Sequence, residues 1–128
     1  MKTGMAVRVA DASILAALIF QEPRRNEAES LLRGADLYAP TLLPYELASI
    51  ARKKSSKCPG KRPQILEALR NALAMDISLV NTDAVEVAAL ALDKGLTVYD
   101  AAYLWLARSL GAELLTFDHN LRSAASGK

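Results

Sequence analysis

The chain has 128 residues, 52% hydrophobic and 23% charged, which is the size and balance of one globular domain. This composition excludes a disordered tail and a collagen-like fibre, and aromatic residues at 5% exclude a core or stacking surface built mainly from rings. The net charge of +2 is too small to indicate a nucleic-acid partner by itself.

Cysteine content and hydropathy favour a cytoplasmic protein. The one cysteine, Cys58, cannot form an internal disulfide. The longest apolar run, Ile14–Phe20, is far shorter than the roughly 20 residues that a membrane span requires. No apolar stretch suited to a signal peptide precedes Asp11, so we expect neither export nor membrane insertion.

The first half of the chain is predicted to alternate between strands and helices. The expected elements are a strand over 5–10, a helix over 13–20, a helix through Ala28, Leu31, Leu32 and Ala35 that Gly34 ends, a strand over 36–39, and a helix with apolar positions 43, 47, 50 and 51. This last helix runs out into the lysines of residues 53–57.

The second half continues the same alternation. The expected elements are a loop over 58–63, a helix over 65–75, a strand over 77–80, a helix that Asp83 caps and Gly95 closes, a helix over 99–110, and a strand over 113–117. Parallel strands need helical crossovers, so we expect one α/β domain over residues 1–128 with a mainly parallel sheet. The small, polar residues 123–128 are expected to fray.

Two aspartates follow predicted strands. Asp11 comes after the first strand and Asp118 after the last, and ligands of open parallel sheets collect beyond the carboxyl ends of the strands. Each aspartate could instead serve only as the N-cap of the next helix, which is a common role for this residue. Both interpretations remain open from the sequence.

Two further carboxylates lie on predicted helices beside apolar residues. Glu46 borders the apolar stripe of its helix, and no basic residue lies within one turn, although a solvated rim position would also explain it. Asp100 shares a helix face with Tyr103, Leu104 and Ala107, which belong inside. Capping of its helix would explain the residue type but not these neighbours.

Convergence of these four carboxylates would require a cation, because like charges repel and raise one another's pKa. Mg²⁺ or Mn²⁺ is expected, since hard ions prefer oxygen ligands and zinc would favour His or Cys, of which the chain has only His119 and Cys58. Metal-assisted phosphodiester hydrolysis is the chemistry that such a site favours.

The segments around these carboxylates are similar to the motifs of PIN-domain ribonucleases, particularly VapC toxins. The matching segments, in chain order, are Val9-Ala-Asp11-Ala-Ser13, Pro44-Tyr-Glu46, Val98-Tyr-Asp100-Ala-Ala-Tyr103-Leu and Leu115-Thr116-Phe-Asp118. The resemblance implies a three-layer α/β/α domain and a Mg²⁺- or Mn²⁺-dependent endoribonuclease, the toxin of a toxin-antitoxin pair. It also implies a homodimer and a cognate antitoxin, for which apolar residues such as Leu31 and Leu32 could provide exposed contacts.

The same resemblance implies roles for individual residues. Asp11 and Asp100 match the positions most regularly bound to metal, Glu46 matches the one that holds or activates water, and Asp118 matches the most variable contributor. Ser13 and Thr116 match small hydroxyl residues beside the site, which could orient a carboxylate or a metal-bound water, or simply cap a turn.

A basic segment follows the predicted Glu46 helix and could bind a phosphate backbone. Its cationic residues are Lys53, Lys54, Lys57, Lys61 and Arg62. The alternative is a solvated helix end, where cations are also favourable. His119 adjoins Asp118, but metal-dependent hydrolysis does not require imidazole, so we do not assign it a direct role.

Two other function classes compete with a nuclease. A phosphoacceptor receiver domain has a similar build, but such a domain has an adjacent pair of acidic residues after its first strand, whereas this chain has Asp11 alone. The central strand of a receiver domain should also end in Asp, where this chain has Asn81. A catalytically idle PIN-like interaction module is the second alternative, and the four carboxylates disfavour it.

Overall fold

The computed structural model describes residues 5–127, whose strands form one all-parallel sheet in the order β3-β2-β1-β4. The strands are β1 (Ala6–Ala10), β2 (Ala35–Pro40), β3 (Ile77–Val80) and β4 (Glu113–Leu115). In β1, Val9 pairs with Tyr38 of β2 and with Leu114 of β4. The first and last strands are therefore neighbours, and their carboxyl ends meet at one edge of the sheet.

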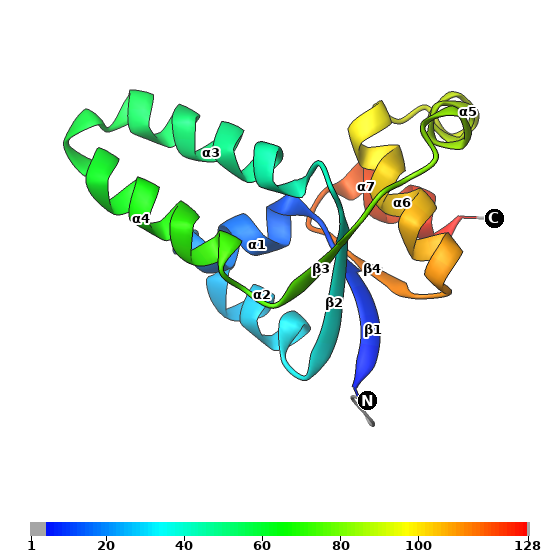
Figure 1. Cartoon of the computed structure of the whole chain (residues 1–128), viewed down its shortest axis with the longest axis horizontal. Helices are drawn as coiled ribbons and strands as arrows, with labels where there is room; N and C mark the ends of the chain where they lie inside the picture. Colours follow the sequence, from blue (N-terminus) through cyan, green and yellow to red (C-terminus); the bar gives the residue numbers. More distant parts are fainter. Residues whose placement is uncertain (1–4, 128) are drawn as a thin grey trace.

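Helices flank this sheet on both faces, with α1 to α4 on one side and α5 to α7 on the other (Figure 1). Their bounds are α1 (Ala12–Ile19), α2 (Arg25–Leu32), α3 (Leu43–Lys57), α4 (Arg62–Leu73), α5 (Ala84–Lys94), α6 (Val98–Leu110) and α7 (His119–Ser126), with a 3₁₀ turn, η1 (Pro59–Lys61), between α3 and α4. The expected α/β fold with a parallel sheet is confirmed.

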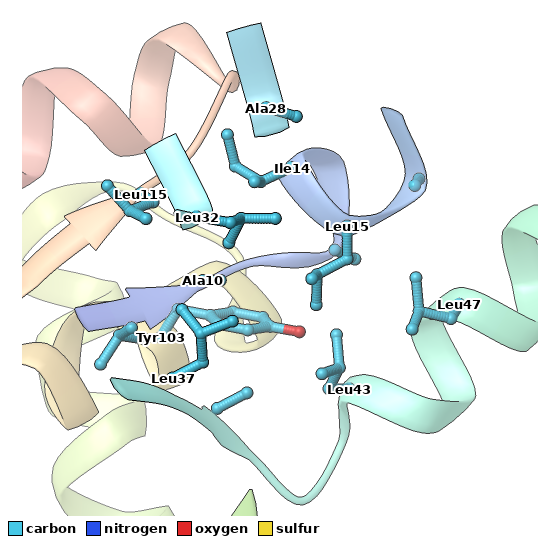
Figure 2. Close-up of a cluster of buried hydrophobic side chains, with 14 of the residues drawn as sticks. Ala10, Ile14, Leu15, Ala28, Leu32, Leu37, Leu43, Leu47, Tyr103 and Leu115 are labelled. Atoms are coloured by element: carbon cyan, nitrogen blue, oxygen red, sulfur yellow. The ribbon is translucent and has the colours of Figure 1, made fainter. Parts of the chain in front are cut away.

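The core is aliphatic, as the composition indicated, and β1 runs through its centre. Ile14 and Leu15 of α1, together with Leu47 of α3, are among the largest fully buried side chains. Figure 2 shows these residues gathered around the end of β1, with the ring of Tyr103 among them. Burial of each such side chain contributes about 1.5–3 kcal/mol, so this packing holds the carboxyl end of β1 in place.

Several element boundaries differ from the prediction for local reasons. Ala35 belongs to β2 and not to the preceding helix, because Gly34 reverses the chain at a positive φ of 70°. The expected loop over 58–63 contains η1, and α4 starts at Arg62 with a proline in its first turn, where proline's missing N–H costs nothing. The end of α4 lies at Leu73, two residues before the expected position.

The last strand is shorter than expected. It ends at Leu115, because the following polar groups bond to side chains: the Phe117 N–H donates to Ser13 and the Asp118 N–H donates to Thr116. The expected fraying of residues 123–128 stays a prediction, since α7 reaches Ser126 and Lys128 lies outside the described residues. Throughout residues 5–127, every helix falls short of the length and apolar character needed to cross a membrane.

Candidate metal centre

Asp11 lies at the carboxyl end of β1 and is held there by four hydrogen bonds. It is the N-cap of α1, and its Oδ1 accepts from the Ser13 N–H (3.0 Å), the Ile14 N–H (3.3 Å) and the Ser13 hydroxyl (2.6 Å). The Thr116 hydroxyl donates to Oδ2. The capping interpretation is therefore correct, and it does not exclude a role at a site, because capping uses only Oδ1.

Ser13 and Thr116 connect the ends of β1 and β4. Each hydroxyl donates to Asp11 and also accepts a backbone N–H from the segment after β4: Ser13 from Phe117 (2.9 Å) and Thr116 from Asp118 (2.9 Å). Of the two interpretations left open by the sequence, orientation of a carboxylate describes both hydroxyls. They fix Asp11 and the Asp118 segment relative to each other.

Glu46 lies in the first turn of α3 and is half-buried. Its Oε1 accepts a hydrogen bond of 2.6 Å from the hydroxyl of Tyr103, which comes from α6. The sequence did not reveal this partner, because 57 residues separate the two side chains. Tyr103 was expected to be a core residue, and at 1% exposure it is one, with its hydroxyl serving the carboxylate as well.

Asp100 lies in the first turn of α6, and Asp118 is the N-cap of α7. The cap of α6 is Thr97, whose hydroxyl accepts the Asp100 N–H, so the capping explanation for Asp100 is wrong. Within residues 5–127 its carboxylate has no hydrogen-bond donor. Asp118 Oδ1 accepts the Leu121 N–H (2.8 Å), which confirms that it caps a helix.

The four carboxylates act on one another electrostatically. Burial raises the pKa of Asp11 more than its hydrogen bonds lower it. Burial also raises the pKa of Glu46, to which the charges of Asp100 and Asp11 add. Asp100 behaves alike: burial raises its pKa first, followed by the charges of Asp118 and Asp11. These effects agree with the positions of the four residues at the starts of α1, α3, α6 and α7.

The donor set suits a hard divalent cation, because it consists of carboxylate and hydroxyl oxygens, and repulsion between carboxylates is what a bound cation would relieve. In residues 5–127, however, no three His, Cys, Asp or Glu side chains are close enough together to form a ready coordination group. The shared metal site therefore stays a prediction.

The basic residues after Glu46 divide into two sets. Lys54, Lys57 and Lys61 line a groove of about 680 Å³ between the end of α1 and the helices α3 and α4, whose apolar lining includes Phe20 and Ile65. We call this the basic groove. Lys54 pairs with Glu22 at 2.7 Å and lies over the Phe20 ring.

Lys53 and Arg62 are exposed but do not line the basic groove. The structure therefore brings together three of the five predicted cations. Lys57 follows Glu46 by eleven positions along α3, which corresponds to about 16 Å along the helix axis.

Comparison with known proteins identifies the family. Residues 8–127 match the PIN domain. The chain belongs to the PIN-domain family. Ribonuclease VapC3 from Pyrobaculum aerophilum is 36% identical over 121 residues, an alignment that covers 88% of this chain and 90% of that protein. The resemblance inferred from the four motifs is thus confirmed.

A solved structure agrees with the PIN assignment. The crystal structure of PAE2754 from Pyrobaculum aerophilum superimposes with a TM-score of 0.78 at 25% identity, covering 95% of this chain and 87% of that one. The PIN-domain match also leaves no basis for the receiver-domain alternative. In this PIN domain, Asp11, Glu46, Asp100 and Asp118 come from four separate segments that the fold joins at one edge of the sheet.

Proposed function

We propose that residues 1–128 act as one domain, a Mg²⁺- or Mn²⁺-dependent endoribonuclease that is the toxin of a toxin-antitoxin pair. The observation that carries the proposal is the position of Asp11, Glu46, Asp100 and Asp118 at the starts of four helices, in a chain related to Ribonuclease VapC3. A cytoplasmic setting is part of the proposal and is supported by the free thiol of Cys58.

The proposed reaction is hydrolysis of an RNA phosphodiester by water. Asp11 and Asp100 would hold the divalent ion, with support from Glu46 and Asp118. A bound ion supplies a lowered water pKa and offsets charge that develops on the phosphate. Ser13 and Thr116 keep Asp11 oriented.

Glu46 is suited to take the proton of the attacking water. Its raised pKa makes it a stronger base than an exposed glutamate, and Tyr103 occupies only Oε1. Oε2 is thus the atom that accepts the proton, while the phosphorus bond to the leaving oxygen breaks and that oxygen takes a proton from solvent.

The basic groove is proposed to hold the RNA backbone beyond the scissile phosphate. In residues 5–127, no carboxylate pairs with Lys57 or Lys61, so both cations are available to phosphates. Lys53 and Arg62 would add longer-range attraction from the exposed surface. Such contacts give affinity with little base preference.

A cognate antitoxin and a second copy of the chain are the proposed protein partners. The expected contacts on α2 are wrong in part, because Leu32 is buried and Leu31 packs partly against the core. A better candidate for the homodimer is α5, where Val85 and Leu92 are 80% and 84% exposed.

The exposed Ala88 and Ala89 lie between Val85 and Leu92, so this face of α5 has a large side chain at each end and two small ones in the middle. In an antiparallel pairing of two α5 helices, Val85 would lie opposite Leu92 and Ala88 opposite Ala89. A twofold interface requires this kind of self-complementary surface.

Incubation of the purified protein with total RNA tests the proposal. We expect new 5′ ends with Mg²⁺ or Mn²⁺, none with EDTA, and none with Asp11→Asn or Asp100→Asn purified identically. Full metal-dependent activity in both variants would refute the assignment. RNA or antitoxin binding without any turnover by the wild type would instead identify an idle PIN-like interaction module.

A further inference from the structure

Tyr103 combines a ring buried in the apolar core with one polar atom, its hydroxyl oxygen. Its side chain is 1% exposed and lies in the main hydrophobic cluster. Figure 2 shows the ring between Ala10 and Leu37, with the hydroxyl oxygen directed toward α3, where Leu43 and Leu47 lie. That oxygen donates to Oε1 of Glu46 at 2.6 Å.

Packing alone does not require this hydroxyl. Phenylalanine would fill the same volume without a buried polar group that needs a partner. For Glu46 the bond matters more, because Tyr103 is its one hydrogen-bond donor in residues 5–127, and a half-buried carboxylate is costly without a donor. The side chain that gains from the hydroxyl is therefore Glu46.

The hydrogen bond of Tyr103 connects Glu46 to α6, the helix that also carries Asp100. Tyr103 follows Asp100 by three residues, so the two side chains lie one turn apart on neighbouring parts of one helix face. The rigid helix α6 thereby sets Glu46 of α3 at a fixed distance from Asp100. Without the bond, the glutamate side chain would be free to change rotamer.

We propose that Tyr103 is a positioning residue, which holds Glu46 through Oε1 and leaves Oε2 as the oxygen that serves the water or the divalent ion. This inference rests on the proposed nuclease function. Tyr103 itself touches neither RNA nor the reacting phosphate.

Tyr103→Phe tests the inference, with Tyr38→Phe as the matched control. Tyr38 is a partly buried tyrosine of β2 whose hydroxyl has no partner among the described residues. We expect Tyr103→Phe to lower kcat about tenfold with KM for RNA unchanged, and Tyr38→Phe to change neither. A kcat of Tyr103→Phe within about twofold of wild type would overturn the proposal.

A double-mutant cycle on Mn²⁺ affinity, measured calorimetrically without RNA, separates positioning from a general packing effect. Tyr103→Phe is expected to weaken Mn²⁺ binding in the wild type and to have no further effect in Glu46→Ala. Equal weakening in both backgrounds would show that Tyr103 does not act through Glu46.

The cycle also separates this inference from the proposed nuclease. A wild type that binds Mn²⁺ but cleaves no RNA would contradict the nuclease and still report on Tyr103. A wild type that neither binds Mn²⁺ nor cleaves RNA would contradict both.

Discussion

Asp11 combines two opposing electrostatic influences. Burial disfavours its charged form and is the larger effect, whereas the hydroxyls of Ser13 and Thr116 and the backbone N–H groups of Ser13 and Ile14 favour that form. A carboxylate held in this way by a helix start and two hydroxyls is already oriented before any ligand arrives. Binding of a ligand to this carboxylate therefore costs little side-chain entropy.

The raised pKa of Asp100 predicts how stability depends on pH. Because its folded pKa lies above the unfolded value, the stability linked to Asp100 is fully present below about pH 4 and is lost as pH rises through the folded value. Asp100→Asn removes this loss. We therefore expect the metal-free variant to be more stable than wild type at pH 7, with a difference that shrinks on acidification.

Urea denaturation in EDTA at several pH values measures this difference. Addition of Mg²⁺ should stabilise the wild type more than Asp100→Asn, because the ion relieves repulsion that the variant lacks. A variant less stable than wild type at neutral pH, or a difference independent of pH, would contradict the electrostatic account.

At the level of single elements, substitutions of Asp118 distinguish its role as a helix cap from the role of its charge. Asparagine caps helices as well as aspartate does, so Asp118→Asn should leave the free energy of unfolding nearly unchanged, whereas Asp118→Ala should lower it by about 1 kcal/mol. Asp83→Ala is the matched control, since Asp83 caps α5 with bonds to Val85 and Glu86. Thermal denaturation of the three variants without metal ions measures the effects.

Activity then distinguishes the two roles of Asp118. If its charge supports metal binding, both Asp118 variants lose activity and Asp83→Ala retains it. Equal activity of Asp118→Asn and wild type would restrict Asp118 to capping.

Local signals along the chain were sufficient for most elements. Asp83 and Gly95 mark the ends of α5 because an Asx cap and a left-handed glycine depend only on neighbouring backbone. The end of β4 could not be predicted in this way. It depends on hydroxyls of Ser13 and Thr116 that meet only after β1 and β4 have paired.

The candidate carboxylates could be predicted from local patterns in the sequence, whereas their contacts with distant residues could not. Asp11 and Asp118 stand at strand ends, and Asp100 stands on an apolar face, all of which periodicity reveals. The bond between Tyr103 and Glu46 joins two helices, and no spacing in the sequence encodes their distance. Residue types were thus readable, but pairings between distant elements required the fold.

At the scale of the whole molecule, the exposed face of α5 predicts association. Leu92→Glu should weaken self-association of the chain at least about tenfold, because a charge would be buried in the apolar interface. The same substitution at Leu73, an exposed leucine of α4, is the control. Sedimentation equilibrium measures both, and a dimer unaffected by Leu92→Glu would place the interface elsewhere.

The basic groove makes a separate prediction for RNA binding. Lys57→Ala and Lys61→Ala should each raise KM without lowering kcat. Each should also reduce the slope of log RNA affinity against log salt concentration by about one. Lys53→Ala, outside the groove, should have a smaller effect. Equal losses for all three lysines would indicate general attraction and no defined track.

Pairing of β1 with β4 also governs when the carboxylates assemble. Asp11 precedes β4 by about a hundred residues, so it is synthesised well before its partner Thr116 and the neighbouring Asp118. A nascent chain that lacks β4 has an incomplete centre. The four carboxylates therefore assemble only after β4 has been synthesised and has paired with β1.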